Sequence, residues 1–288
     1  MDGRICIVTG ANSGIGKATA AGLAQQDATV VMVCRDQKRG VAARDDIVSA
    51  SGSTSVDLLV ADLSSQQSIR QLAEEFKRKY QQLHVLVNNA GVFHSQRSVT
   101  ADGLEYTFAL NHLAYFLLTS LLLDVLTASA PSRIVNLTSG AERAGKIDFD
   151  DLQGEQRFKG TRAYSQSKLA NVLFTYELAR RLQGTHVTVN CVQPGAVRTN
   201  FGRDATGLFG LSVRILTPLM KPPEQGAETP IYLATAPEIE GVSGKCFIGK
   251  KQVQTSRRSY DETVARHLWE VSEKLSHVAQ ESGLLDRQ

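Results

Sequence analysis

Short, apolar, β-branched runs alternate along this chain with longer amphipathic stretches, and this alternation restricts the fold more than any other feature. Strands are predicted at Ile5–Thr9, Thr29–Cys34, Ser55–Val60, Val85–Asn88, Arg133–Leu137, Val187–Val192 and Lys245–Ile248. Helices are predicted between them at Lys17–Gln26, Gln37–Ser49, Gln66–Tyr80, Gly103–Thr127 and Tyr164–Arg181. The first six strands are apolar on both faces, as parallel strands are when helices cover both sides of a sheet. The pattern therefore predicts an α/β fold, a doubly wound parallel sheet of about seven strands with helices on both faces.

No repeat, low-complexity tract or linker divides the sequence, so residues 1–288 are predicted to form a single domain. Two segments interrupt the regular alternation. The segment 201–223 is rich in apolar side chains and contains three glycines, which predicts a flap over a substrate site. The segment 260–280 is amphipathic, carries the only tryptophan, Trp269, and is predicted to be a C-terminal helix.

Charge and cysteine content narrow the class of protein. The net charge is +3 and the Lys and Arg residues are scattered, which argues against a nucleic-acid partner. The four cysteines lie far apart without CxxC spacing, which favours a reduced, cytoplasmic compartment. The six histidines show no metal-ligand spacing, so no metal is expected, and His112 is predicted to line the core or a pocket.

Neither a leader nor an integral membrane span is expected. The first predicted strand begins at Ile5, which leaves little room for a signal peptide. The most apolar later stretch, Leu113–Leu126, is interrupted by Thr119, Ser120 and Asp124 and falls short of the ~20 residues that a span requires. A soluble protein is therefore expected, with peripheral contact with a membrane left open.

A glycine-rich turn follows the first predicted strand directly. It places Gly10, Asn12, Ser13, Gly14, Ile15 and Gly16 between that strand and the next helix, with GxxxGxG spacing. Glycine permits a tight turn and close approach of a pyrophosphate, which the N–H groups of the helix N-terminus then bind. The alternative is a loop that only caps the helix. At the end of the first strand of a βα unit, the turn predicts a Rossmann-type dinucleotide site.

The residue after the second predicted strand indicates which dinucleotide binds. NAD enzymes usually carry an acidic residue there to bind the ribose diol, whereas this strand ends in Cys34 followed by Arg35. A guanidinium at this point would pair with the 2′-phosphate of NADP(H). Asp36 comes next and would favour a diol, and Arg35 would have no such role if it merely ended the strand. The charge-assisted pairing favours NADP(H) as the cofactor.

Two further strand ends are predicted to border the same site. Asp62 and Leu63 follow the third strand, where the Asp62 carboxylate would accept a hydrogen bond from the adenine amino group. Asn89, Ala90 and Gly91 follow the fourth strand and are small enough to lie against the cofactor. Alternatively, Asp62 caps a helix and Asn88 and Asn89 are turn residues.

Tyr164 and Lys168 lie four residues apart in a helical stretch, and therefore on one face. A nearby ammonium, together with the positive charge of an oxidised nicotinamide, favours phenolate and lowers the tyrosine pKa, which makes Tyr164 a candidate general acid/base. Lys168 would also hold the nicotinamide ribose. Ser139, just beyond the fifth strand, would donate a hydrogen bond to the substrate oxygen, and Asn111 would bind a water that connects Lys168 to solvent. Taken alone, a Tyr–Lys pair on a helix is usually a surface feature; its combination with the glycine turn favours catalysis.

Together these residues resemble the short-chain dehydrogenase/reductase family over residues 4–250, through Thr9-Gly10, Gly14, Gly16, Asp62, Asn88-Asn89-Ala90-Gly91, Asn111, Ser139, Tyr164, Lys168 and Pro194-Gly195. The resemblance implies a catalytic tetrad of Asn111, Ser139, Tyr164 and Lys168. It also implies that Tyr164 and Lys168 contact the cofactor, together with Pro194, Gly195, Val197 and Thr199 around the nicotinamide carboxamide. Motifs such as Val33-Cys34-Arg35-Asp36 and Ser167-Lys168-Leu169-Ala170-Asn171 resemble the retinol dehydrogenase branch.

The leading hypothesis is an NADP(H)-dependent oxidoreductase that interconverts a lipophilic, retinal-like aldehyde or ketone and its alcohol. The alternatives are an NADP(H)-binding redox sensor without turnover and a structural scaffold. In the family, the helices around Asn111–Leu126 and Tyr164–Leu182 form dimers, so the resemblance also implies a homodimer.

Overall fold

The computed structural model describes residues 1–198 and 220–278. One eight-stranded sheet, ordered β3-β2-β1-β4-β5-β6-β7-β8, forms its centre. All neighbouring strands pair in parallel except β7 and β8, which are antiparallel. The strands are β1 Ile5–Thr9, β2 Thr29–Cys34, β3 Val56–Val60, β4 Val85–Asn88, β5 Ser132–Leu137, β6 Val187–Val192, β7 Lys245–Ile248 and β8 Lys251–Val253. The order reverses at β1, as in the doubly wound fold predicted from the sequence.

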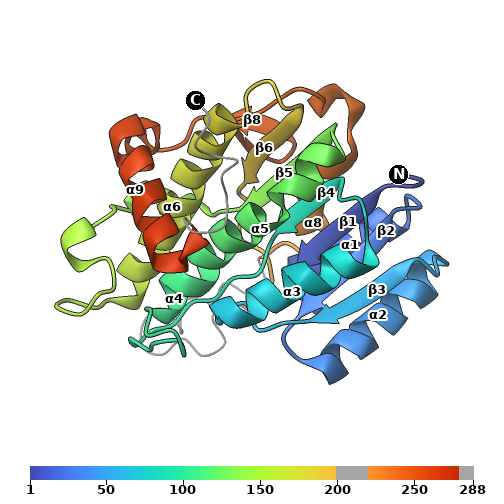
Figure 1. The fold of residues 1–288 in the computed structure, drawn as a ribbon, viewed down its shortest axis with the longest axis horizontal. Helices are drawn as coiled ribbons and strands as arrows, with labels where there is room; N and C mark the ends of the chain where they lie inside the picture. The colour runs from blue at the N-terminus through green and yellow to red at the C-terminus, as the bar shows by residue number, and fades with distance from the viewer. Residues whose placement is uncertain (199–219, 279–288) are drawn as a thin grey trace.

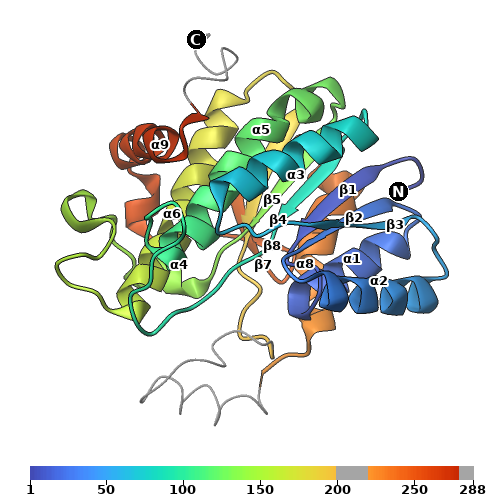
Figure 2. The same cartoon turned by 60° about the horizontal axis from the view of Figure 1, so that its bottom comes forward.

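Helices cover both faces of this sheet. The principal helices are α1 Gly14–Ala24, α2 Gln37–Ser51, α3 Gln66–Lys79, α5 Ala114–Ala128, α6 Gly160–Arg181, α8 Pro223–Thr235 and α9 Glu262–Ser276. Figure 2 shows α1, α2 and α8 on one side of the sheet and α3, α5 and α6 on the other. Shorter helical turns are α4 Tyr106–Phe108, Gly140–Ala144, Phe149–Asp151, Pro237–Ile239 and Arg257–Tyr260.

The strands are buried as the sequence predicts, with one exception. β1, β2, β4 and β6 lie almost entirely inside the protein. β3 is the edge strand, and its Asp57 and Val60 are exposed, so the expectation that this strand is covered on both faces is wrong. Cys6, Cys34, Cys191 and Cys246 are all free and buried, as small apolar residues are in a core.

Several element boundaries differ from the prediction. α6 begins at Gly160 instead of Tyr164, and α9 ends at Ser276 instead of near residue 280. α8 was not predicted because it begins with Pro223 and contains Gly226 and Pro230, residues that normally interrupt helices. Pro223, the last residue of the predicted flap at 201–223, is therefore the first residue of α8. Residues 199–219, which make up most of that flap, lie outside the described structure.

The eighth strand, β8, was missed because it has no sequence signal of its own. β8 has only three residues, two of them exposed, and shows no apolar alternation. Its position is fixed by the turn that connects it to β7, in which Gly249 and Lys250 both adopt positive φ values of 54° and 65°. Two consecutive left-handed residues form the type of tight turn that joins antiparallel strands.

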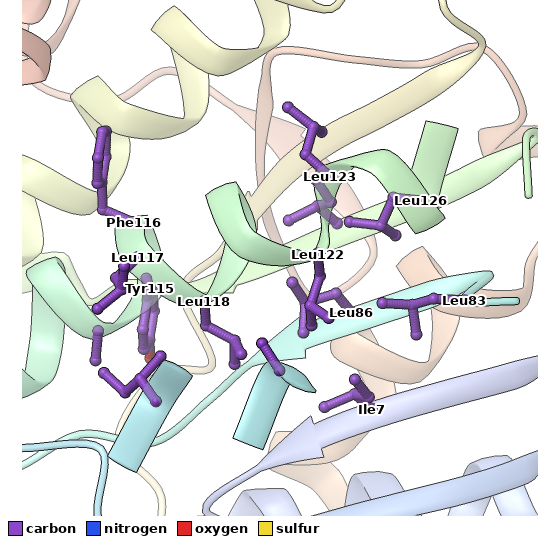
Figure 3. Close-up of a cluster of buried hydrophobic side chains, with 14 of the residues drawn as sticks. Ile7, Leu83, Leu86, Tyr115, Phe116, Leu117, Leu118, Leu122, Leu123 and Leu126 are labelled. Carbon is purple, nitrogen blue, oxygen red and sulfur yellow. The ribbon is translucent and has the colours of Figure 1, made fainter. Parts of the chain in front are cut away.

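One helical rod runs from Tyr106 to Ala128 and changes type within its length. α4 leads into a π-helical turn at Ala109–Leu113, which continues as α5. Of the helices in residues 1–198 and 220–278, only this one, with 23 residues, is long and apolar enough to cross a membrane. The expectation that the apolar stretch is too short for a span was therefore wrong, because the helix extends beyond Leu113–Leu126 at both ends. However, 72% of its most apolar window is buried within the protein, as expected of a core helix. Figure 3 shows Leu118 and Leu122 turned towards β4 and Ile7, and Phe116 on the side of α6.

The C-terminal helix α9 lies alongside α6 (Figure 1). Trp269 is its main anchor: its ring contacts Phe116 of α5 at 4.9 Å and Phe174 of α6 at 5.9 Å between centroids. The Arg181 guanidinium lies 4.2 Å from the Trp269 ring centroid. Trp269 is only 3% exposed, so α9 is part of the core on this side of the sheet.

Candidate active site

A cavity of about 890 Å³ opens at the carboxyl ends of the parallel strands. Its size is at the upper end of the range for small-molecule sites. It contains nearly all of the residues that the sequence predicts for the cofactor and the reaction. They are Gly10, Asn12, Ser13, Gly14, Ile15, Gly16, Arg35, Asp62, Leu63, Asn89, Ala90, Gly91, Ser139, Tyr164, Lys168, Pro194, Gly195 and Val197. Asn111 lies behind the wall of this cavity, and Thr199 lies outside the described residues.

The turn after β1 leaves no room for a side chain at Gly16. Gly10 and Gly14 adopt positive φ values of 65° and 56°. A Cβ atom on Gly16 would lie 2.4 Å from the carbonyl oxygen of Gly10 and 2.4 Å from Nδ2 of Asn89. Asn89 itself donates a hydrogen bond to the carbonyl oxygen of Thr9 at 2.7 Å, so it ties the β4 end to this turn. The N-terminus of α1 therefore faces the cavity with glycine backbone beside it, which is the arrangement that binds phosphates.

Basic side chains border the cavity where β2 ends. Arg35 is exposed, and its Nη1 donates to the hydroxyl of Tyr106 at 3.0 Å. Asp36 is the N-cap of α2, and its Oδ1 accepts from the backbone N–H of Arg39 at 2.8 Å. This capping role explains the acid that follows Arg35 in the sequence. Arg39 also lines the cavity.

Asp62 is held by the loop that follows β3. Its Oδ1 accepts from the backbone N–H of Ser64 at 2.9 Å and from the Ser64 hydroxyl at 2.7 Å. The N-cap of α3 is Ser65, so the alternative in which Asp62 caps this helix is wrong. Asp62 instead forms a local turn at the edge of the cavity.

The Thr9 hydroxyl also holds the end of β4 against β1. Thr9 Oγ1 accepts from the backbone N–H groups of Asn89 at 2.8 Å and Ala90 at 3.0 Å. Asn88, one residue earlier, is fully buried and donates to Asn136 at 2.9 Å, so it belongs to the core. The sequence could not separate these two adjacent asparagines, because their difference arises from the pleat of the strand.

Asn111 holds the chain beyond β4. Its Oδ1 accepts from the backbone N–H of Val92 at 2.8 Å, and its Nδ2 donates to the Val92 carbonyl at 3.0 Å and to Ser167 Oγ at 3.0 Å. The side chain is fully buried and lies within the π-helical turn. Asn111 thus connects the segment after Gly91 to α6. These contacts give it a structural role.

Ser139, Tyr164 and Lys168 meet at the opposite wall. Tyr164 and Ser139 share a side-chain hydrogen bond, which favours the phenolate, but burial raises the pKa of Tyr164 to about 12. Burial also lowers the pKa of Lys168 to about 8. The Lys168 Nζ lies 5.6 Å from the Tyr164 ring centroid and donates to the Leu137 carbonyl at 3.3 Å.

In the protein without bound cofactor, the pKa of Tyr164 therefore lies above its usual value, whereas the sequence predicts a lowered pKa beside both the ammonium and an oxidised nicotinamide. In the protein alone, loss of hydration outweighs the Ser139 hydrogen bond at Tyr164, and it acts against the charged forms of both Tyr164 and Lys168. Tyr164 is therefore a neutral phenol at ordinary pH, and as such a proton donor.

The family follows from a direct comparison. A sequence model described as short chain dehydrogenase matches residues 4–206. The chain belongs to the short chain dehydrogenase family.

Relatives of this short chain dehydrogenase include retinol dehydrogenases. Retinol dehydrogenase 14 of Mus musculus is 47% identical, over 95% of this chain and 86% of the relative. Retinol dehydrogenase 13 of Homo sapiens is 48% identical, over 96% of this chain and 85% of the relative. The chain is therefore an oxidoreductase of the retinol dehydrogenase branch, acting on a carbonyl–alcohol pair.

Solved structures share its fold. An uncharacterised protein from Mycobacterium paratuberculosis superposes with a TM-score of 0.78 at 33% identity, covering 96% of this chain and 94% of that chain. The RhlG protein of Pseudomonas aeruginosa, solved as an active-site complex with NADP, has a TM-score of 0.69 at 29% identity, covering 86% of this chain and 94% of that one.

Sequence reasoning missed part of the site of this short chain dehydrogenase. Phe93 contacts the Tyr164 ring edge-on at 5.9 Å between centroids, and His94 stacks on Tyr106 at 4.7 Å. Phe93 and His94 lie two and three residues after the predicted Asn89–Gly91 segment, and this proximity was the available signal. Tyr106 gave no such signal, because it comes from a distant helix start. Met220, at the end of the predicted flap, also lines the cavity.

Proposed function

We propose that this short chain dehydrogenase reduces lipophilic aldehydes or ketones with NADPH, and oxidises the matching alcohols in reverse. The observation that carries the proposal is the meeting of Ser139, Tyr164 and Lys168 in one cavity with the glycine turn of β1. Such a cavity brings a proton donor and a dinucleotide cradle to the same small molecule.

The residues present fit a dinucleotide with a 2′-phosphate. Gly10, Gly14 and Gly16 would leave the pyrophosphate against the N-terminus of α1, where a Cβ atom on Gly16 would collide with backbone. Arg35 and Arg39 would border the 2′-phosphate, and the engagement of Asp36 with the α2 N-terminus supports this choice over a ribose diol. The cofactor, when bound, supplies the hydride.

The protein's own residues then handle the proton. The hydroxyls of Ser139 and Tyr164 would both bind the carbonyl oxygen of the substrate, which draws electron density from its carbon. Tyr164 would donate its proton to that oxygen as the alcohol forms. Lys168, with its pKa lowered to about 8 by burial, remains mostly an ammonium at neutral pH and would stabilise the phenolate left behind.

An apolar wall supports a lipophilic substrate. Phe93 packs beside Tyr164, and Leu110 and Met220 also line the cavity. The retinol dehydrogenase relatives support a retinal-like aldehyde as the first substrate to test. Apolar lining of this kind favours long hydrocarbon chains over sugars or small polar ketones.

The proposal is tested by incubating the protein and NADPH with each of four compounds: all-trans-retinal, a long-chain aldehyde, a long-chain ketone and a sugar. Turnover is measured as the loss of absorbance by the reduced nicotinamide. We expect turnover of the lipophilic carbonyls with NADPH. Cofactor binding without turnover of any carbonyl or alcohol would favour a redox sensor. Absence of cofactor binding would favour a scaffold.

Cofactor choice gives a second test. We expect Arg35→Ala to weaken NADPH binding about tenfold more than NADH binding, because only NADPH carries the phosphate that the exposed guanidinium would meet. The Kd of each cofactor is measured by protein fluorescence. Arg44→Ala is the matched control, since Arg44 lies on α2 and pairs with Asp45 at 2.8 Å outside the cavity lining. Equal losses for NADPH and NADH would refute a role for Arg35 in binding the phosphate.

A further inference from the structure

A chain of buried polar contacts connects α9 to the Lys168 region. His112 lies in the π-helical turn and is 1% exposed. Its Nε2 lies 2.9 Å from Ser272 Oγ on α9, and its Nδ1 lies 3.4 Å from Asn171 Oδ1 on α6. Asn171 Nδ2 donates to the Leu137 carbonyl at 3.2 Å, and the same oxygen accepts from Lys168 Nζ at 3.3 Å. His112 therefore contacts Asn171, which shares the Leu137 carbonyl oxygen with Lys168.

The hydrogen bonds fix the direction of this chain. Because Asn171 Nδ2 donates to the Leu137 carbonyl, Asn171 Oδ1 faces His112 and requires a donor. The proton of a neutral His112 therefore sits on Nδ1, and Nε2 accepts from the Ser272 hydroxyl. Burial supports the neutral ring, since it lowers the pKa of His112 to about 4. The Ser272 hydroxyl also donates to the Leu268 carbonyl at 2.7 Å, so its single hydrogen is shared between that oxygen and His112 Nε2.

The two donors at the Leu137 carbonyl share one oxygen. Lys168 and Asn171 lie three residues apart on α6, and both reach the end of β5, two residues before Ser139. If His112 did not bind Asn171 Oδ1, the Asn171 amide would be free to rotate away from the Leu137 carbonyl. Lys168 Nζ would then be the only one of the two donors left on that oxygen. The distance between the ammonium and the Tyr164 hydroxyl would then change.

α9 is placed firmly enough to serve as the outer end of this chain. Trp269 lies one turn before Ser272 and packs against both α5 and α6. No residue of α9 lines the described cavity. Any effect of α9 on the reaction must therefore pass through its contacts with the helices that carry Asn111, Tyr164 and Lys168.

We propose that His112 is a positioning residue for Lys168, and that Ser272 of α9 fixes the orientation of its ring. The proposal rests on the function proposed above, in which Lys168 serves the proton donor. It assigns α9 to the catalytic framework, although the helix lies behind the site.

Two serines of α9 form a matched pair for the test. Ser272 and Ser276 are both fully buried, and each hydroxyl contacts the carbonyl four residues earlier, at 2.7 Å and 2.5 Å. Only Ser272 contacts His112. We expect Ser272→Ala to lower kcat about fivefold while the Kd for NADPH stays within about twofold, and Ser276→Ala to leave kcat unchanged. Equal effects of the two variants on kcat, or no effect of either, would overturn the proposal.

Variants of His112 keep the proposal testable if Ser272→Ala fails to fold. The side-chain amide of asparagine places an N–H close to the position of Nδ1, whereas leucine offers none. We expect His112→Leu to lower kcat and His112→Asn to restore most of it, at similar thermal stability. If both variants lose kcat in proportion to their loss of stability, the role of His112 is structural only and the proposal is wrong.

Nitrogen NMR separates this proposal from the proposed function. The ¹⁵N shifts of His112 report which ring nitrogen is protonated, without any turnover. We expect the neutral Nδ1–H form in the unmodified protein and in Ser276→Ala, and an altered Nε2 shift in Ser272→Ala. An Nε2–H ring in the unmodified protein would disprove the chain of contacts. A wild-type protein with the expected NMR pattern but no turnover would disprove the proposed function instead.

Discussion

Replacing Tyr164 by phenylalanine is expected to lower kcat for carbonyl reduction about 10³-fold, within the range known for loss of a general acid. The substitution removes one hydroxyl and leaves the ring, so the edge-on contact with Phe93 is retained. Tyr164 lies at the cavity wall beside Ser139, and burial keeps it a neutral phenol that would supply the proton. The measurement is single-turnover oxidation of bound NADPH, together with the Kd for NADPH, which should change little.

Tyr176→Phe provides the matched control for this substitution. Tyr176 lies on the same helix, is 7% exposed, and its hydroxyl bonds to Thr255 at 2.8 Å away from the cavity. It therefore loses a buried hydroxyl without touching the site, and kcat should persist. If Tyr164→Phe and Tyr176→Phe retain similar rates, Tyr164 has no part in the proton transfer.

The second large effect is expected from Gly16→Ala. The added Cβ would meet the Gly10 carbonyl and Asn89 Nδ2 at 2.4 Å, so the turn itself must shift. A displacement of about 1 Å in a positioning element lowers rates about 100-fold, and we expect a loss of this size in kcat/KM, mostly through weaker NADPH binding. Steady-state kinetics at varied NADPH concentration measures it.

Gly140→Ala tests whether the effect is specific to the turn. Gly140 follows Ser139 directly, and the nearest atom to an added Cβ there would be Gln193 Oε1 at 3.8 Å, an ordinary contact. Alanine at this position should leave kcat/KM close to that of the unmodified protein. Comparable losses from both alanine variants would mean that the packing of Gly16 does not determine cofactor binding.

The sequence predicts the sheet well because its strands are buried and apolar. β1, β2, β4, β6 and β7 begin and end where the pattern places them. Prediction fails where a neighbour determines the structure: β8 depends on its turn with β7, and α8 begins and continues through prolines that a helix tolerates only in the right context. Such elements have no local signal of their own.

The site shows the same division. Glycines and strand-end residues were found from spacing, since the carboxyl ends of parallel strands must meet. Tyr106 reaches Arg35 across 71 positions of sequence, a contact that spacing cannot reveal. The raised pKa of Tyr164 in the protein alone had no signal in the sequence either, because burial is a property of the folded chain.

The π-helical turn has a consequence for how this rod tolerates insertions and deletions. A wide turn accommodates one residue more than a regular helix, and each residue corresponds to a rotation of about 100° around the axis. Because of the extra residue, Tyr106 contacts Arg35 and Asn111 contacts Val92 from the first part of the rod. Leu118, in the second part, still faces the sheet (Figure 3). Shortening the rod by a single residue here would regularise the helix and turn its first half away from both partners. The length of this turn, and not only its composition, is therefore a requirement of the architecture.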